Sequence, residues 1–179
     1  MKISSLSLSS PDEWPHAKQQ CSDFFRRYSN EQLTHEDHQC LATLSYDELL
    51  KPGTSIVAAT VRSDVGHIPV GICFAANYGE DACMVAVHPL YRNRRIGSSL
   101  IRSLLIRVGR LRCKVAAEYS ASLKMCFHAG LQAVALEQGP TGKPTFIMST
   151  ALPSNQFRSF LTTSADSIQE GELPCQNPS

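Results

Sequence analysis

The chain of 179 residues has no run of membrane-spanning length that is free of charged and frequent polar residues. Its first residues, MKISSLSLSSPDEW, lack the apolar core of a signal peptide. Aromatic residues make up only 7% of the chain, and no basic stretch is interleaved with aromatic side chains as single-stranded nucleic-acid binding requires. These absences predict a cytoplasmic protein whose partners are neither a membrane nor a nucleic acid.

Paired cysteine spacing is also missing. The seven cysteines are odd in number and scattered, and several fall inside apolar strand or helix patterns. They are typical of small, reduced core residues. His35, His38 and Cys40 form a local group of potential metal ligands, but the chain offers no matching second half, so we expect no metal site.

The composition is that of one globular domain. Hydrophobic residues make up 42% and charged residues 18% of the chain, and 179 residues suffice to bury a substantial core. From Pro153 onward the sequence turns to Ser, Thr, Gln and Pro with few large apolar residues. We therefore predict a single domain over residues 1–152 and a flexible C-terminal tail over residues 153–179, with a helical turn near Phe157–Leu161.

Acidic residues are absent from residues 82–117, although the net charge of the whole chain is only +1. This segment carries eight basic side chains, at positions 92, 94, 95, 102, 107, 110, 112 and 114. A solvated helix face is the usual explanation of such a run, and nucleic-acid binding is a second. An anionic ligand of small size is a third explanation, and the local structure of the segment favours it.

The segment Met84–Leu105 reads as a strand, a basic turn and an amphipathic helix. Met84 to Val87 form a short apolar run, Pro89 ends it, and apolar residues from Ile96 to Leu111 then recur at helical spacing. The N–H groups of a turn and of the first helical turn point outward together, and the helix dipole adds positive charge there. The segment therefore predicts a phosphate site near Arg92–Ser99.

These residues resemble the signature of the GNAT superfamily of acetyl-CoA-dependent N-acetyltransferases. The family pattern is a strand with V-x-P, then Y-R or Y-Q, then R/Q-x-x-G-x-G/A opening a helix, and this chain offers Val87-His88-Pro89, Tyr91 and Arg92 to Gly97. Arg95 stands where the family has its first glycine. The resemblance covers about residues 2–151, with the elements in the family's order.

The resemblance and the periodicity together predict a single α/β domain with a mixed, mostly antiparallel sheet flanked by helices. Helices are expected after the capping boxes that begin at Ser10 and Ser45, from Ile96, and over Ser120–Ala129, which Gly130 ends. Strands are expected at 2–8, 55–62, 68–78, 84–87, 113–119, 132–137 and 145–151. The segment 29–44 is less regular.

The resemblance implies acetyl-CoA as co-substrate and an amine as acceptor, either a small molecule or a protein. Dimers are frequent in the family, so it also allows a homodimer. The implied cofactor-binding residues are Val85 and Val87 on the strand and Arg92, Asn93, Arg94, Arg95, Ile96, Gly97, Ser98 and Ser99 in the turn and helix. The pantetheine arm is expected along the strand, where a backbone amide near Val87 would polarise the thioester carbonyl.

The resemblance also suggests the catalytic groups. Family members often have an acidic general base on or just before the motif strand, where Glu80 and Asp81 lie, and Glu118 is a third choice. The family's general acid is a tyrosine four residues before a Gly-Phe pair. Here Gly130-Leu131 matches the pair and Cys126 occupies the tyrosine position, so Tyr119 is the substitute candidate.

Two functions stay open at this point. One is direct acetyl transfer from acetyl-CoA to an amine, with the acidic N-terminal half hinting at a cationic acceptor. The other is a catalytically weak acyl-CoA-binding module that regulates a partner, because Arg95 and Cys126 replace the usual family residues. His88 has a pKa suited to a base, but we assign it a structural role.

Overall fold

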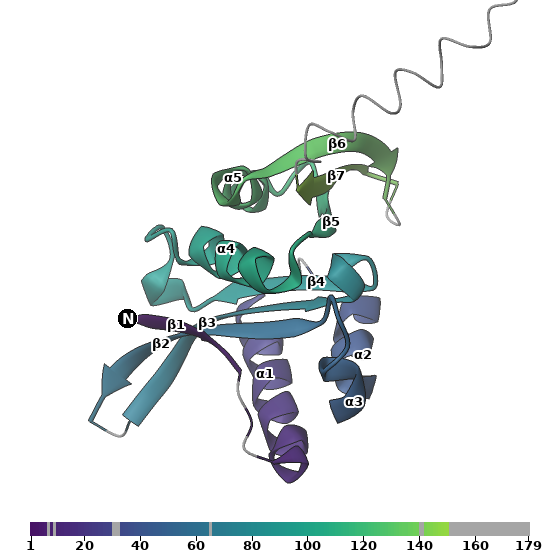
Figure 1. Ribbon diagram of the computed structural model, residues 1–179. Helices are drawn as coiled ribbons and strands as arrows, with labels where there is room; N and C mark the ends of the chain where they lie inside the picture. Colours follow the sequence, from purple (N-terminus) through teal and green to yellow (C-terminus); the bar gives the residue numbers. More distant parts are fainter. Residues whose placement is uncertain (7, 9, 30–32, 65, 140–141, 151–179) are drawn as a thin grey trace, which may run out of the picture.

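The structure is a computed structural model, and it describes residues 1–6, 8, 10–29, 33–64, 66–139 and 142–150. The predicted tail over residues 153–179, with its helical turn, lies outside the described residues. Over the described part, the chain forms two antiparallel sheets with helices on both faces of the first (Figure 1). Within these residues no helix is long and apolar enough to span a membrane.

The first sheet has four strands and the second has three. The first has the order β1 (Lys2–Ser5), β2 (Ser55–Ser63), β3 (Gly66–Ala76), β4 (Ala82–Val87), and the second has the order β5 (Arg112–Ala116), β7 (Pro144–Thr150), β6 (Leu131–Gln138). Each pair of neighbouring strands is antiparallel. The predicted fold class and all seven predicted strands are confirmed, and the sheet is divided between β4 and β5.

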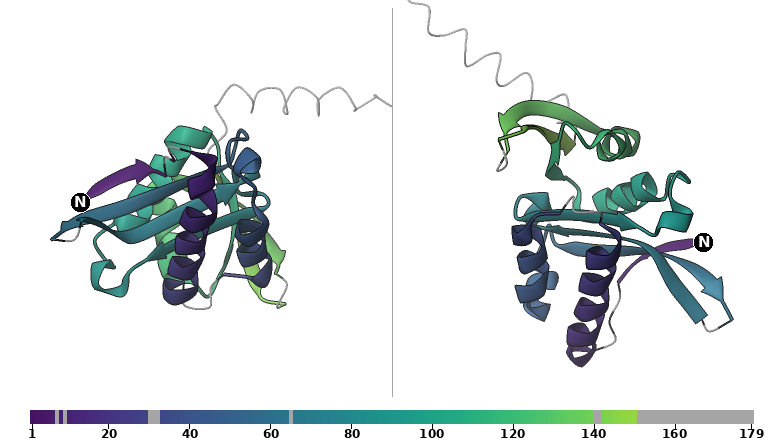
Figure 2. Two further views of the ribbon diagram at one scale, coloured as in Figure 1. Left: turned by 90° about the horizontal axis from the view of Figure 1, so that it is seen from below. Right: turned by 180° about the vertical axis from the view of Figure 1, so that it is seen from behind.

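The helices lie in two layers. They are α1 (Trp14–Tyr28), α2 (His35–Thr43), α3 (Tyr46–Leu49), α4 (Ile96–Val108) and α5 (Ser120–Ala129), with 3-10 turns at Pro11–Glu13 (η1), Asn77–Gly79 (η2) and Pro89–Tyr91 (η3). Figure 1 and both views of Figure 2 place α1, α2 and α3 on one face of the first sheet and α4 on the other. Helix α4 therefore lies between the two sheets.

Side-chain alternation along β4 divides the core into two hydrophobic clusters. Ala82, Met84 and Ala86 pack in the cluster with α1 and α2. Cys83 and Val85 pack against the other cluster, which contains α4 residues and side chains of the second sheet. Because successive side chains of a strand point to opposite faces, one short strand contributes to both cores.

The helix ends show which capping signals the chain uses. Ser45 and Glu48 form the predicted capping box, with Ser45 N–H donating to Glu48 Oε2 over 2.8 Å. The box predicted at Ser10 is wrong, because residues 11–13 form a 3-10 turn and the Ser10 side chain makes no capping bond. Helix α2 was not predicted. It begins with a Thr34–Asp37 capping box, in which aspartate replaces the glutamate or glutamine of the usual pattern.

Candidate cofactor and catalytic site

Strands β4 and β5 are edges of different sheets, and their first residues lie close together. The Glu80 carboxylate is 3.6 Å from the Arg112 guanidinium, and the Cys83 and Cys113 thiols hydrogen-bond. Gly79 packs so tightly against the Arg112 carbonyl oxygen that a β-carbon would overlap it. The two strands are thus joined at their starts, and they belong to separate sheets beyond this point.

The backbone of β4 offers hydrogen-bonding groups on its edge away from β3. His88 N–H donates to the Val70 carbonyl over 2.9 Å, and Val87 is opposite Gly71 in the register. Because bonded and non-bonded pairs alternate in an antiparallel ladder, Val85 and Val87 direct their N–H and C=O groups away from β3. The Val87 carbonyl accepts a hydrogen bond from Arg92 Nε over 3.1 Å, in agreement with this direction.

The turn before α4 has the backbone conformation of an anion-binding loop. Asn93 has a φ of 62° and Arg95 a φ of 59°, both in the left-handed region. The first bond of the helix at this end runs from Ser99 N–H to the Arg95 carbonyl, so the N–H groups of Ile96, Gly97 and Ser98 precede it. Left-handed residues next to a helix N-terminus bring several N–H groups together.

The φ of Arg95 explains why the family has glycine at this position. Glycine adopts a left-handed conformation without steric cost, whereas another L-residue pays about 1–2 kcal/mol. We expect Arg95→Gly to raise the free energy of unfolding by about 0.5–1 kcal/mol, because the gain is partly offset by the larger entropy of glycine in the unfolded chain. Urea denaturation measures this change. Asn93→Gly is the control, and it should change stability less because asparagine tolerates this conformation.

Arg92 is directed at the protein backbone. Its Nη2 donates to the Tyr28 carbonyl over 2.9 Å, and its Nε bonds Val87. Tyr28 is the last residue of α1, where the helix dipole favours a positive charge. Arg92 therefore connects the end of α1 to the end of β4, and its predicted contact with a cofactor stays a prediction.

Gly97 and Ser98 hold α4 against α5. A β-carbon on Gly97 would overlap the Met125 sulfur, and the Ser98 hydroxyl donates to the Met125 carbonyl over 3.1 Å. Ser98 is buried, so its side chain serves packing between the helices. Met125 gave no signal in the sequence, because nothing local indicates which distant residue packs on a glycine.

Most of the cations of the basic segment have partners within the protein. Arg102 bonds the Ser98 carbonyl, Arg107 bonds the Ser55 hydroxyl, Arg110 lies over the Tyr78 ring, and Arg112 and Lys114 pair with Glu80 and Glu137. Arg94 lies over the Tyr91 ring and remains exposed. Arg95 is exposed too, and within the described residues its side chain has no partner. The charges available to a ligand are therefore concentrated at the turn.

The candidate acids and bases lie in different surroundings. Glu80 is about half exposed beside Arg112, and it lines a cavity of about 160 Å³ with Glu137. Tyr119 is half-buried at the start of α5, just beyond the end of β5. Glu118 is bound by Lys143 Nζ over 2.7 Å. Asp81 faces a separate cavity.

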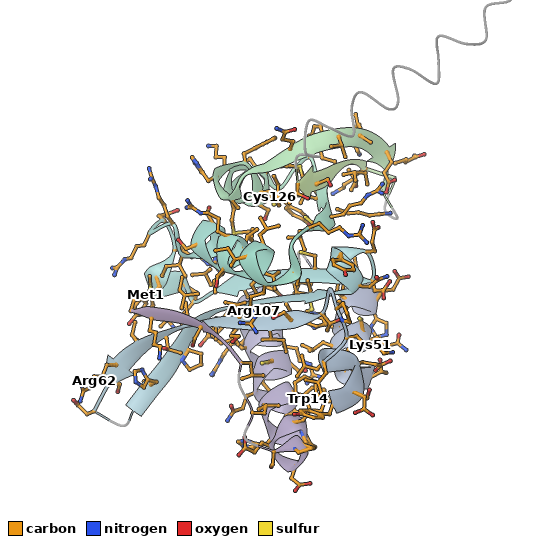
Figure 3. The ribbon with its side chains drawn as sticks, viewed as in Figure 1. Met1, Trp14, Lys51, Arg62, Arg107 and Cys126 are labelled. Carbon is orange, nitrogen blue, oxygen red and sulfur yellow. The ribbon has the colours of Figure 1, made fainter. Side chains whose placement is uncertain are left out.

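Cys126 lies in the core between α5 and the second sheet, where Figure 3 labels it. It is 4% exposed. A hydrogen bond with Cys113, and then burial, raise the pKa of the Cys126 thiol well above its usual value. Such a thiol is a weak proton donor, and it is enclosed by other core residues.

His88 has the structural role that we assign to it from the sequence. Its Nδ1 accepts a hydrogen bond from Leu90 N–H over 3.3 Å, and this bond caps the turn η3. Its ring packs against Tyr28 and Tyr91, with centroids 4.8 and 5.8 Å away. His88 thus fixes the chain where β4 leads into the basic turn.

No protein-family model matches the sequence, and no curated protein matches it. Solved structures do match. The aminoglycoside acetyltransferase AAC(6')-Ib bound to coenzyme A and kanamycin has a TM-score of 0.53 at 11% identity, covering 88% of this chain and 98% of that one. Spermidine N-acetyltransferase SpeG from Vibrio cholerae has 0.52 at 11%, covering 89% and 99%. A GNAT-family protein from Desulfovibrio desulfuricans has 0.56 at 15%, covering 83% and 98%. The chain has the fold of the GNAT acetyltransferases.

Proposed function

We propose that this protein is an N-acetyltransferase that moves an acetyl group from acetyl-CoA directly to a primary amine. The observation that carries the proposal is the turn before α4, with Arg95 in the left-handed conformation that the family's glycine adopts. The turn lies beside the free edge of β4 and between exposed cations. This combination suits a ligand that carries a diphosphate and an extended arm.

The residues fit such a cofactor. The backbone N–H groups from Asn93 to Ser98 would hold the diphosphate, with Arg94 and Arg95 adding positive charge. The free N–H and C=O groups of Val85 would pair with an amide-bearing arm as a further strand would. When bound, acetyl-CoA supplies the activated acyl group as a thioester. Val87 N–H, on the same edge, is the donor suited to stabilise negative charge on an acyl oxygen.

We assign the proton transfers to side chains at the two ends of the divergence between β4 and β5. Glu80, at the start of β4, would accept the proton that the amine loses. Tyr119, beyond the end of β5, would donate a proton to the departing thiolate. Tyr119 is preferred to Cys126 because the Cys126 thiol is enclosed in the core and its pKa is raised.

A catalytically weak acyl-CoA-binding regulator is the second candidate function. It is favoured by Cys126, since a buried cysteine at the position of the family's tyrosine removes the usual general acid. The two candidates share the cofactor site and differ in turnover. Release of free CoA that depends on an amine therefore separates them.

The proposal predicts that the protein binds acetyl-CoA and that Arg95→Glu weakens the binding about tenfold, because a carboxylate replaces a guanidinium beside the phosphates. Isothermal titration calorimetry measures the affinity. Arg62→Glu is the matched control. It makes the same charge change on β2, and Figure 3 shows Arg62 on the hairpin that projects away from α4.

Release of CoA is then followed with a thiol reagent over a panel of primary amines. Amine-dependent release supports the transferase, and binding without release supports the regulator. If Arg95→Glu and Arg62→Glu weaken acetyl-CoA binding equally, the turn is not the cofactor site and both candidates lose their basis.

A further inference from the structure

A cavity of about 340 Å³ lies beside the start of β4, separate from the basic turn. It is bounded by α2, α3, the loop before β2 and the connection from β3 to β4. Its lining includes Cys40, Thr43, Glu48, Lys51, Asn77 and Asp81. The volume is at the lower end of the range for small-molecule sites, so it suits a small ligand better than a folded partner.

The polar groups of this cavity favour a cation. Asp81 and Glu48 bring two carboxylates to it. Glu48 is held by hydrogen bonds from the Ser45 backbone and hydroxyl, and these bonds lower the pKa of its carboxyl group and keep it ionised. Asn77 Nδ2 donates to Asp81 Oδ1 over 3.1 Å, so the Asp81 carboxylate is fixed in direction.

The Cys40 thiol reports the electric field inside the cavity. Burial is the largest cause that raises its pKa, and the carboxylates of Asp81, Asp37 and Glu48 raise it further. Three carboxylates thus act on one point of the lining. Lys51 is the one basic side chain of this lining, and Figure 3 shows it at the surface beyond α3.

The end of α2 adds further negative potential. Thr43 and Leu44 line the cavity at the C-terminus of this helix, where unpaired carbonyl groups carry the negative end of the dipole. The ammonium group of Lys18 already binds there, to the Ala42 carbonyl over 2.8 Å and the Leu44 carbonyl over 3.1 Å. The same surroundings therefore hold an alkylammonium group of the protein itself.

The cavity also lies at a suitable place along β4. Asp81 directly precedes the strand, and the basic turn follows its other end. The strand of six residues spans about 17 Å at its usual rise. A cofactor arm that begins at the turn and follows β4 toward Ala82 would thus bring its reactive end to the side of the cavity.

We propose that this cavity is a cation subsite for the acceptor, in which Asp81 and Glu48 bind one ammonium group of a small aliphatic diamine or polyamine while a second amino group receives the acetyl group. The inference rests on the proposed function and adds the substrate class. A monoamine of similar length would lack the group that the cavity binds.

The test compares 1,4-diaminobutane with butylamine as acceptors in the presence of acetyl-CoA. We expect the diamine to have a KM about tenfold lower, because only it places a second charge between the carboxylates. Asp81→Asn should raise the KM of the diamine about tenfold and leave that of butylamine unchanged. Asp47→Asn is the matched control, since Asp47 is an exposed residue of α3 outside the cavity lining.

Two calorimetric titrations separate failure of this inference from failure of the proposed function. The first measures acetyl-CoA binding, which Asp81→Asn should not change. The second measures 1,4-diaminobutane binding to the CoA-loaded protein, with or without turnover. Diamine binding that Asp81→Asn weakens and Asp47→Asn does not supports the subsite even if no acetyl transfer is seen. No diamine binding, or equal KM values for the two amines, overturns it.

Discussion

Replacing Gly79 with alanine should lower the free energy of unfolding by about 3 kcal/mol or more. Two costs combine at this position. The φ of Gly79 is +88°, which costs an L-residue about 1–2 kcal/mol. The added β-carbon would also overlap the Arg112 carbonyl oxygen, and overpacking against rigid backbone costs about 1–3 kcal/mol. Because Gly79 and Arg112 bring the starts of β4 and β5 together, the substitution would force the two sheets apart.

Gly130→Ala is the matched control for this prediction. Gly130 has a φ of +96°, but a β-carbon there would meet nothing within 4 Å. It should therefore cost only the conformational penalty of about 1–2 kcal/mol. Urea denaturation of both variants gives the comparison. Equal losses of stability would show that close packing at Gly79 does not hold the sheets together.

Glu80→Gln should lower kcat/KM for an amine about a hundredfold, in line with the usual contribution of a general base. Loss of stability would not account for such an effect. Glu80 and Arg112 have side chains that are 51% and 53% exposed, and an ion pair of this kind contributes about 1 kcal/mol at most. Steady-state rates of CoA release measure the change, with acetyl-CoA affinity as an independent reading that should stay constant.

The control is Glu137→Gln. Glu137 lines the same small cavity as Glu80 and pairs with Lys114 over 2.7 Å, so the substitution removes a comparable charge and a comparable ion pair. Its rate should remain near that of the unchanged protein. A rate for Glu80→Gln equal to that for Glu137→Gln would place the base elsewhere, and Asp81 would be the next residue to replace.

The sequence predicts the strands well because their side chains alternate or form short apolar runs between turn residues. Helices α4 and α5 were predicted for a similar reason, and Gly130 ends α5 in the left-handed conformation as expected. Helix α2 was missed because its residues, HEDHQCLAT, have no clear apolar face. Its start depends on the Thr34 cap, which is a local signal in a variant form. The break between β4 and β5 depends on packing between distant residues.

The candidate site divides in the same way. The basic turn was predictable because its signal is contiguous, from the proline after β4 to the small residues of α4. The contacts of Arg92 with Tyr28 and of Gly97 with Met125 join positions far apart in the chain, and no short pattern encodes them. The cavity beside Asp81 combines residues from four segments, so only the folded chain reveals it.

The separation of the two hydrophobic clusters by a single sheet has a consequence for how such a protein can diverge. Substitutions in α2 or α3 repack one cluster, while α4 and the second sheet keep the other, and distant sites of this kind change stability independently. Mutational drift can therefore remodel the cavity half of the molecule and leave the half with the basic turn intact. A shared backbone with very different residues is the expected evolutionary outcome of this two-core construction.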